Sequence, residues 1–522
     1  MKFMKKIYSC LLLAVGLAAC DKNFEKVNVN PVLPTSLDPG YVFTNAEFTT
    51  SFYHLLYQDA IVQQVIIPFG GVNEGGNHNV VYDPNTNTTF NSLYNTVLNN
   101  SNNNGTNGPV KLLMDVISRT KDDPARSNLY NMSRIWRAFV FQILVDTYGD
   151  VPYSEAGKAY TGSINLPKYD DQKVIYDDLL KELSEATKAL DPAKRIETSD
   201  FFYAGNIAQW KRLGNSILLR VAMRLTKADA AKAKQYVLVA TDPANGGVMQ
   251  SVADNAMIVF SSNFNHPNAG ALQGTERANF YLGKPFVDTL RNNNDPRLSF
   301  IAVKYATPAN PLATALPANT TPAEQEGMPF GYNETTIVNA PGYPGKIGAA
   351  FKYSQLNRQT VAKIDATDFF ITHAQTQLLL AEATQRGFIT GTPVATYYNA
   401  GVRAHMDQMK QFDAAAVIAT GTQDAYLTAH PFDPARALEQ INTQYWIASF
   451  LNGIEGWANF RRSGYPSLAA NPYPQADPSV TNAFIRRLIY PVREQSVNTE
   501  NYKAAVTRMG ADNFATRVFW DK

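Results

Sequence analysis

Two segments of the chain combine glycine and asparagine with residue types that hold hydroxyl-rich ligands. The first, residues 70–82 (GGVNEGGNHNVVY), offers Asn73, Glu74, His78 and Tyr82. Amide and carboxylate groups bind hydroxyls in pairs, and a flat ring packs against the apolar face of a ligand. A polar surface loop with ordinary turn chemistry would have the same composition. The pattern therefore allows either a ligand-binding loop or a plain surface loop.

The second segment is residues 264–281 (FNHPNAGALQGTERANFY), which supplies His266, Arg277 and Tyr281. An aromatic ring there would stack against a sugar or a peptide plane, while the arginine would hold its polar edge. Phe280 fits a ring buried under a loop equally well. We expect Tyr281 to be the ligand contact of the two.

Catalytic and metal-binding motifs are missing from the sequence. It contains no GxSxG elbow, no P-loop and no HExxH. The histidines His54, His373, His405 and His430 lack the HxxxH or HxH spacing of a transition-metal site. Residues 83–88 (DPNTNT) alternate Asp and Asn oxygens but lack the glycine and distal glutamate of an EF-hand loop. We expect no metal and no cofactor, with calcium at residues 83–88 as the one weak exception.

A non-catalytic binding protein is the function that this pattern favours. The alternative is a secreted, α-rich glycan hydrolase, which would need two carboxylates facing each other across a cleft. Glu74 and Glu276 are available for that role, but nothing in the sequence pairs them.

The element best defined by the sequence is a helix that begins at Ser127. Apolar residues recur at three- and four-residue steps and cover most of its surface: Leu129, Met132, Trp136, Phe139, Val140, Ile143 and Leu144. Gly149 and Pro152 end it, since glycine takes the left-handed conformation and proline cannot continue a helix. A helix that is apolar on most sides needs neighbours, so we expect a mostly α fold built as a stack of helix pairs.

The same period predicts helices at 110–119, 170–190, 206–225, 228–239, 368–385, 393–412, 435–451 and 453–462. We divide the chain accordingly into a helical scaffold at 39–241, with a loop insertion at 68–108, an irregular insertion at 242–366, the rest of the scaffold at 367–462, and a mixed segment at 463–522. The irregular insertion is rich in Pro, Gly and Asn, and its short β-rich runs lie at 256–260 and 300–305.

The N-terminus carries an export signal. Residues 1–19 pair a basic start with an apolar run shorter than the roughly 20 residues that span a bilayer. Leu17-Ala18-Ala19-Cys20 is similar to a bacterial lipobox, in which the cysteine takes the lipid; the alternative is an ordinary secretory signal that contains a cysteine. Cys20 would be the only cysteine of the mature chain, because Cys10 is removed with the signal. Residues 20–38 would then be a lipidated tether.

The charge balance excludes one class of partner. Lysine and arginine number 47 against 45 aspartates and glutamates, a formal net charge of +2. A nearly neutral chain lacks the positive field that draws proteins to phosphate backbones. Nucleic acid is therefore not an expected ligand.

Several stretches together resemble the SusD/RagB family of outer-membrane nutrient-binding lipoproteins. They are the lipobox at Cys20, LVDTYGDVPYSEA at 144–156, LLLAEATQRG at 378–387, and GIEGWANFRRSGYP at 453–466 followed by RRLIYPVREQSVNTENYKAA at 486–505, with a weaker NDPRL at 294–298. Many members have an Arg-Tyr-Ala-Glu-like start to one helix where this chain has Thr372-His373-Ala374-Gln375. The chain is therefore more similar to a second, divergent SusD-like branch, and we carry over no ligand residue.

The resemblance implies a SusD-like fold with tetratricopeptide-like helix pairs as a scaffold. It also implies a place in the outer membrane, held by the lipid anchor and facing the cell surface. The implied partner is a SusC-like TonB-dependent transporter, on which the lipoprotein would sit as a lid. The implied ligand is an oligosaccharide or a peptide.

Overall fold

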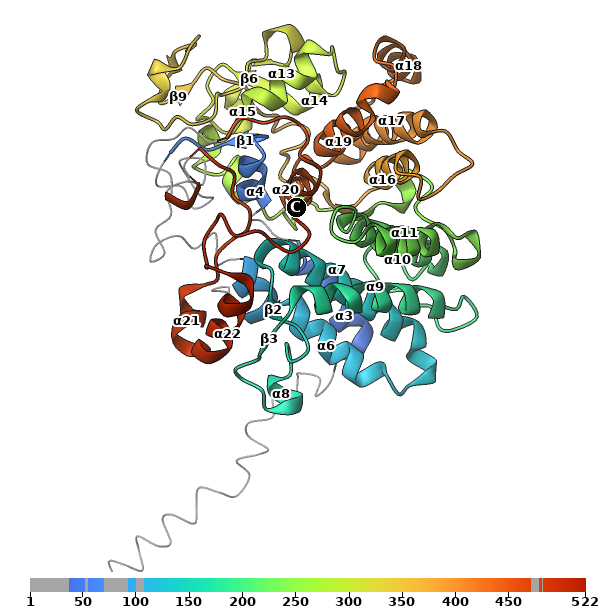
Figure 1. The fold of residues 1–522 in the computed structure, drawn as a ribbon. Coiled ribbons are helices and arrows are strands. Elements are labelled where there is room, and N and C mark those ends of the chain that lie inside the picture. The colour runs from blue at the N-terminus through green and yellow to red at the C-terminus, as the bar shows by residue number, and fades with distance from the viewer. Residues whose placement is uncertain (1–36, 52–54, 70–92, 100–107, 471–477, 481) are drawn as a thin grey trace, which may run out of the picture.

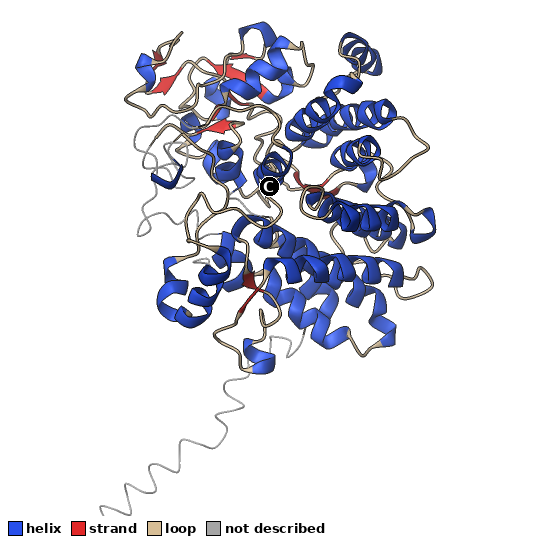
Figure 2. Ribbon diagram, in the orientation of Figure 1, coloured by secondary structure: helices blue, strands red, loops and turns tan. Residues whose placement is uncertain are grey.

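A computed structural model describes residues 37–51, 55–69, 93–99, 108–470, 478–480 and 482–522. The signal segment, Cys20 and nearly all of the predicted tether lie outside these ranges. Within them the chain is mostly helical, and its strands are two to four residues long (Figure 2). The mostly α fold class predicted from the sequence is therefore confirmed.

The first part of the scaffold consists of α3 (Pro39–Phe48), α4 (Leu55–Ile61), α6 (Pro109–Thr120), α7 (Ser127–Tyr148), α9 (Gln172–Ala189), α10 (Ile207–Arg224) and α11 (Ala230–Thr241). Helix α7 is buried along almost its whole length, as its apolar pattern predicted. It ends at Gly149, whose φ of 81° is a conformation that glycine adopts without strain. Consecutive helices pack side by side, with α6 on α7, α7 on α9, and α9 on α10 (Figure 1).

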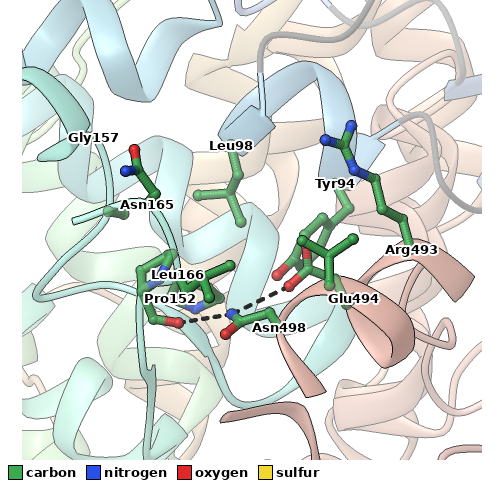
Figure 3. Close-up of a pocket in the computed structure, with 12 residues that line it drawn as sticks. Tyr94, Leu98, Pro152, Gly157, Asn165, Leu166, Arg493, Glu494 and Asn498 are labelled. Carbon is green, nitrogen blue, oxygen red and sulfur yellow. Dashed lines mark hydrogen bonds between the residues drawn. The ribbon is translucent and has the colours of Figure 1, made fainter. Parts of the chain in front are cut away.

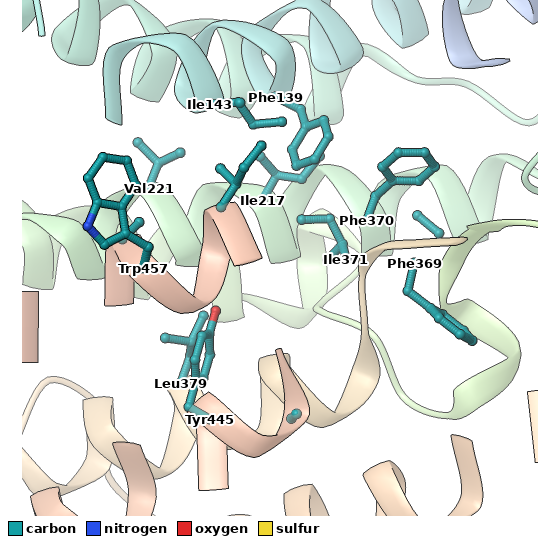
Figure 4. Packing of buried hydrophobic residues seen from close by; sticks show 14 of the residues in the cluster. Phe139, Ile143, Ile217, Val221, Phe369, Phe370, Ile371, Leu379, Tyr445 and Trp457 are labelled. Atoms are coloured by element: carbon teal, nitrogen blue, oxygen red, sulfur yellow. The ribbon is translucent and has the colours of Figure 1, made fainter. Parts of the chain in front are cut away.

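The second part consists of α16 (His373–Gln385), α17 (Val394–Phe412), α18 (Thr420–Ala429), α19 (Ala437–Ala448) and α20 (Gly453–Ser463). It joins the first part through α10 on α16 and through α20, which packs on both α4 and α7. The C-terminal segment adds α21 (Val492–Val497) and α22 (Thr499–Met509). Side chains of α7, α10, α19 and α20 converge in the core, as Figure 4 shows for Phe139, Val221, Tyr445 and Trp457.

One predicted helix begins later than the sequence suggested. Residues 368–371 form strand β11 (Asp368–Ile371), which pairs antiparallel with β4 (Ala256–Ile258). Only after it does α16 begin, where Thr372 and Gln375 close a capping box. The predicted helix was too long because Phe369, Phe370 and Ile371 fit the apolar pattern of a helix and that of a buried strand equally well. The partner strand also lies more than 100 residues away in the sequence, so no local pattern indicated it.

Residues 242–366 contain short elements only. Helices α12 (Ala269–Gln273), α13 (Lys284–Asn292), α14 (Leu298–Ile301) and α15 (Leu312–Ala315) alternate with strands. A five-stranded antiparallel sheet has the order β1-β5-β10-β6-β7, and its strands are β1 (Val65–Ile66), β5 (Tyr281–Leu282), β10 (Gln355–Leu356), β6 (Ala302–Tyr305) and β7 (Ala318–Asn319). Strands β8 (Lys346–Ile347) and β9 (Ala350–Phe351) form a separate antiparallel pair and precede β10 in the sequence. The β-rich runs predicted at 256–260 and 300–305 correspond to β4 and β6.

A few other short elements lie in the first half of the chain. Strands β2 (Val151–Pro152) and β3 (Tyr169–Asp170) form a pair, and α8 (Ala159–Gly162) lies between them in sequence. A π-helical turn, η2, spans Asn95–Asn99. Across the described part of the chain, no helix has the length and apolarity to span a membrane.

Buried ion pairs fasten the helices to one another. Arg224 of α10 donates to Asp146 of α7 at 3.2 Å and to Glu455 of α20 at 2.5 Å. Arg462 of α20 makes a two-pronged pair with Glu382 of α16, at 2.6 and 2.7 Å. Asp146, Glu382, Glu455 and Arg462 lie in the stretches that carried the family resemblance. Those stretches therefore contribute to holding the scaffold together.

Candidate functional site

The segment 264–281 places one aromatic ring at the protein surface, next to rings from two other parts of the chain. Phe264 lies 4.7 Å from Phe48, ring centre to ring centre, and Phe48 lies 6.5 Å from Phe201. Phe264 and Phe201 are each 46% exposed. Phe260 backs the group, stacked 6.0 Å from Phe264. We call Phe48, Phe201, Phe260 and Phe264 the aromatic ledge.

Short-range hydrogen bonds hold the outer rings of the ledge in place. Ser261 and Phe264 exchange two backbone hydrogen bonds of 2.9 Å, which closes a tight turn under the Phe264 ring. On the other side, Glu47 accepts from the Phe201 N–H at 3.0 Å. Because Glu47 precedes Phe48 in α3, this one contact positions two of the four rings.

A second carboxyl lies beneath the ledge. Asp200 accepts from the N–H groups of Phe202, Tyr203 and Gly205 and from the Trp210 indole. Burial, together with the nearby Asp200 carboxylate, raises the pKa of Glu47 well above its usual range. Glu47 therefore stays protonated to a higher pH than an exposed glutamate does.

The ledge has the chemistry of a sugar-binding surface. Half-exposed rings cover the apolar face of a pyranose, and exposed Asn45, Asn263 and Asn265 lie beside them in sequence with amide groups for hydroxyls. A group of exposed aromatic rings of this kind is a common mark of a binding site.

His266 lies at the inner edge of the ledge and is half-buried. Its ring is 5.3 Å from that of Phe260, and its Nδ1 accepts from the Asn268 N–H at 3.0 Å. Burial lowers the pKa of His266, so the ring is neutral near pH 7. It lines a small internal cavity with Asp368, whose carboxyl pairs with Ser51. The structure therefore gives His266 a supporting position behind the rings.

Arg277 and Tyr281 have partners inside the fold. Arg277 donates to the carbonyls of Gln273 and Ala309, both at 2.8 Å, and so braces the segment that carries it. Tyr281 has no exposed surface, and its hydroxyl accepts from the Phe351 N–H at 2.9 Å. The expectation that Tyr281 contacts the ligand is wrong for this conformation, because its position in β5 points the ring into the core beneath the five-stranded sheet.

The other predicted residues give less information. Asn73, Glu74, His78 and Tyr82 lie outside the described residues, as does the calcium candidate at Asp83. Glu276 is exposed and pairs with Asn279, and its proposed hydrolase partner Glu74 is not described. Among the residues that are described, no group of three His, Cys, Asp or Glu side chains is arranged to hold a metal ion.

A narrow groove opens in the irregular insertion, with a volume of about 260 Å³. Its lining residues are Lys304, Tyr305, Pro308, Pro344, Ile347, Phe351, Lys352, Tyr353 and Gln355. Two residues outside the lining contact Phe351, which is part of it. Phe69, directly before the first segment, stacks 5.8 Å from Phe351, and Tyr281 of the second bonds to the Phe351 backbone.

A second cavity, of about 160 Å³, lies where α21 meets the 152–167 region (Figure 3). The polar groups at its base bond to one another. The Tyr94 hydroxyl donates to Tyr169, which donates to Glu494, and Asn498 bonds to both Glu494 and the Pro167 carbonyl. This cavity therefore looks like a junction between two parts of the scaffold.

Sequence reasoning missed most of these residues. Phe48 and Phe201 lie more than 150 residues apart, and no local pattern links them. The groove residues lie at 304–355, where the sequence has no period. The available signal was the density of Tyr, Phe and Gln between 343 and 355 in a segment too rich in Gly and Pro to form a core of its own.

Comparisons with known proteins identify the relatives of this chain. The model of the SusD-like family described as "Starch-binding associating with outer membrane" matches residues 47–491. A solved structure described as a chitin-binding protein is 30% identical, with a TM-score of 0.78 over 93% of this chain and 100% of the other. A search of curated proteins found no match.

Two further structures have the same fold. One is described as a Bacteroidetes SusD-like protein and is 28% identical, with a TM-score of 0.75 over 93% of this chain and 100% of the other. A SusD homologue from Bacteroides uniformis is 22% identical, with a TM-score of 0.73 over 93% and 99%. A carbohydrate-binding role fits these relatives, and none of them supports the hydrolase alternative. Because the family model covers most of its length, the chain belongs to the SusD-like family.

Proposed function

We propose that the protein is a cell-surface lipoprotein that captures an oligosaccharide and delivers it to a SusC-like TonB-dependent transporter in the outer membrane. The similarity over 93% of this chain to a protein described as chitin-binding carries this proposal. The first ligand to test is therefore a β-1,4-linked N-acetylglucosamine oligomer, and a peptide is the second. The aromatic ledge is the proposed main contact surface.

No covalent step belongs to this function. The rings of the ledge would cover the apolar faces of the sugars, and neighbouring amides would bind their hydroxyls. A ligand held between the lipoprotein and the transporter would favour the closed lid only in proportion to the extra contacts that it makes there. Lipid on Cys20 would hold the protein at the membrane.

The binding proposal is tested with the soluble protein that begins after Cys20. Calorimetry with N-acetylglucosamine, glucose and peptide oligomers should detect binding to a glycan. Phe264→Ala and Phe201→Ala should each weaken it about tenfold, because a stacked ring is lost. Leu238→Ala is the matched control, since Leu238 is 49% exposed on α11, away from the ledge. Binding only to peptides, or glycan binding unaffected by both ledge variants, would contradict the proposal.

The anchor and the partner need a separate experiment. The full chain and its Cys20→Ser variant are expressed in a bacterium that sorts lipoproteins, with a radiolabelled fatty acid. We expect label and outer-membrane association in the wild type only, and co-purification of a transporter-sized barrel with it. An unlabelled, periplasmic wild-type protein without a barrel partner would overturn this part of the proposal.

A further inference from the structure

We infer that the narrow groove in the irregular insertion is a second subsite, which recognises the acetamido group of an N-acetylated sugar. This inference rests on the proposed oligosaccharide-binding function and narrows its ligand class.

The lining of the groove favours a partly apolar group. Pro308, Pro344, Ile347, Tyr305 and Phe351 supply its apolar part. Tyr305 is 4% exposed and Phe351 is 1% exposed, so neither ring has an open face on which a sugar ring could lie flat. A substituent of the sugar is the part of the ligand that we place in the groove.

Two polar atoms of the lining have no hydrogen-bond partner among the described residues. They are the Gln355 Oε1 and the Tyr353 Oη, and both side chains are 3% exposed. Buried polar atoms are almost always paired, because leaving one unpaired costs stability. Both atoms belong to residues that line the same groove, and a ligand bound there would supply the missing partners.

The two atoms are chemically complementary to a secondary amide. The Gln355 Oε1 can only accept, so it suits the amide N–H. Burial raises the pKa of Tyr353, so its hydroxyl stays protonated and can donate to the amide carbonyl. The methyl group of the acetamide would then contact the proline and isoleucine walls. A hydroxyl at the same position of a neutral glucan offers neither the carbonyl nor the methyl group.

Contacts behind the groove fix its walls before any ligand arrives. The guanidinium of Arg358 lies 4.1 Å from the Tyr305 ring centre and donates to the Pro308 carbonyl at 3.1 Å. Tyr281 holds the Phe351 backbone from the opposite side. A groove already fixed by such contacts loses little freedom on binding, which raises its selectivity.

The similarity to a protein described as chitin-binding makes an amino sugar a better candidate for this groove than a peptide. Of the two lysines in the lining, Lys304 is paired with Glu326 at 3.5 Å and Lys352 is exposed. We therefore favour the amino sugar, and the peptide becomes an outcome of the test.

The test compares three pentasaccharides with the same β-1,4 backbone: the N-acetylglucosamine, glucosamine and glucose oligomers. Wild-type protein should bind the acetylated oligomer about tenfold more tightly than the glucose oligomer by calorimetry. Gln355→Met and Tyr353→Phe keep the size of each side chain and remove one polar group. Each variant should lose most of the preference for the acetylated oligomer and keep the wild-type affinity for the glucose oligomer. Saturation transfer from the protein to the acetyl methyl protons, measured by NMR, should also be lost.

Gln408→Met is the matched control, because the Gln408 Oε1 is also buried without a partner but lies in the scaffold cavity beside His266. It should keep the full preference. Equal wild-type affinity for all three oligomers, or an unchanged preference in both groove variants, would overturn the acetamido subsite while leaving glycan binding intact. Tighter binding of an acetylated dipeptide amide than of any sugar would also overturn it. Absence of any glycan binding by the wild type would instead refute the proposed function itself.

Discussion

Glu47 accepts a hydrogen bond from the backbone N–H of Phe201 at 3.0 Å, so one buried carboxyl joins α3 to the loop that carries the far ring of the ledge. The same carboxyl faces Asp200, which is held by four N–H donors. This pair fixes the ledge and also makes its stability depend on pH.

Glu47→Gln should stabilise the protein at neutral pH. The folded-state pKa of Glu47 is raised above its usual 4.5, so the folded state holds a proton that the unfolded state releases as pH rises. The contribution of Glu47 to the free energy of unfolding of the wild type is fully present below about pH 4.5. It is lost as the pH rises towards the pKa of Glu47 in the folded state. Urea unfolding at several pH values should show a flatter dependence of the free energy of unfolding on pH for the variant, since glutamine does not titrate. A variant less stable than wild type at pH 7 would show that Glu47 is ionised.

The Arg462–Glu382 pair should make the protein less stable as the pH falls, which is opposite to the effect of Glu47. The adjacent arginines outweigh burial and lower the pKa of Glu382 from 4.5 to about 2. This stability is present above pH 4.5 and is lost as pH falls towards 2, by about 3 kcal/mol. Comparison of wild type with Glu382→Gln by urea unfolding should show the loss in the wild type only. At pH 7 the variant should be destabilised by about 3–5 kcal/mol, because Arg462 is left buried without its partner charge.

Gly214→Ala should weaken the contact between α9 and α10. A Cβ at Gly214 would lie 2.1 Å from the Thr187 Oγ1 and 3.1 Å from its Cβ, too close for the two helices to keep their spacing. Overpacking of this kind costs about 1–3 kcal/mol. Gly421→Ala in α18 has no atom within 4 Å of its new Cβ and should gain up to about 1 kcal/mol from helix propensity. Equal thermal midpoints for the two variants would contradict the close approach.

Tyr281→Phe should lower stability without weakening ledge binding. Removing the hydroxyl leaves the Phe351 N–H buried without its acceptor, at a cost of about 1–3 kcal/mol. Affinity for a glucose oligomer, measured by calorimetry below the unfolding transition, should stay within about twofold of wild type. A tenfold loss of that affinity at unchanged stability would restore Tyr281 as a ligand contact.

The long helices could be predicted because their signals are local. In α7 the apolar period, Gly149 and Pro152 all lie within 30 residues and agree with one another. Strand β11 could not be predicted in this way, since Asp368–Ile371 forms a strand by pairing with β4, which is distant in sequence. The same limit applied to Tyr281, which we expected on a loop surface from the sequence. In the structure, β5 pairs with Val65–Ile66 and with Gln355, and the Tyr281 ring lies in the core.

The sequence alone determined the helical stack and the family resemblance, because periodicity, helix-end signals and the residues of buried pairs such as Glu382 and Arg462 are local features of the sequence. The tertiary structure decided which side chains face outward together. Phe48, Phe201 and Phe264 become one ledge, and Tyr353 and Gln355 end with unpaired polar atoms, through contacts between segments far apart in the chain. Such contacts depend on the packing of the whole fold, and no short stretch of sequence encodes them.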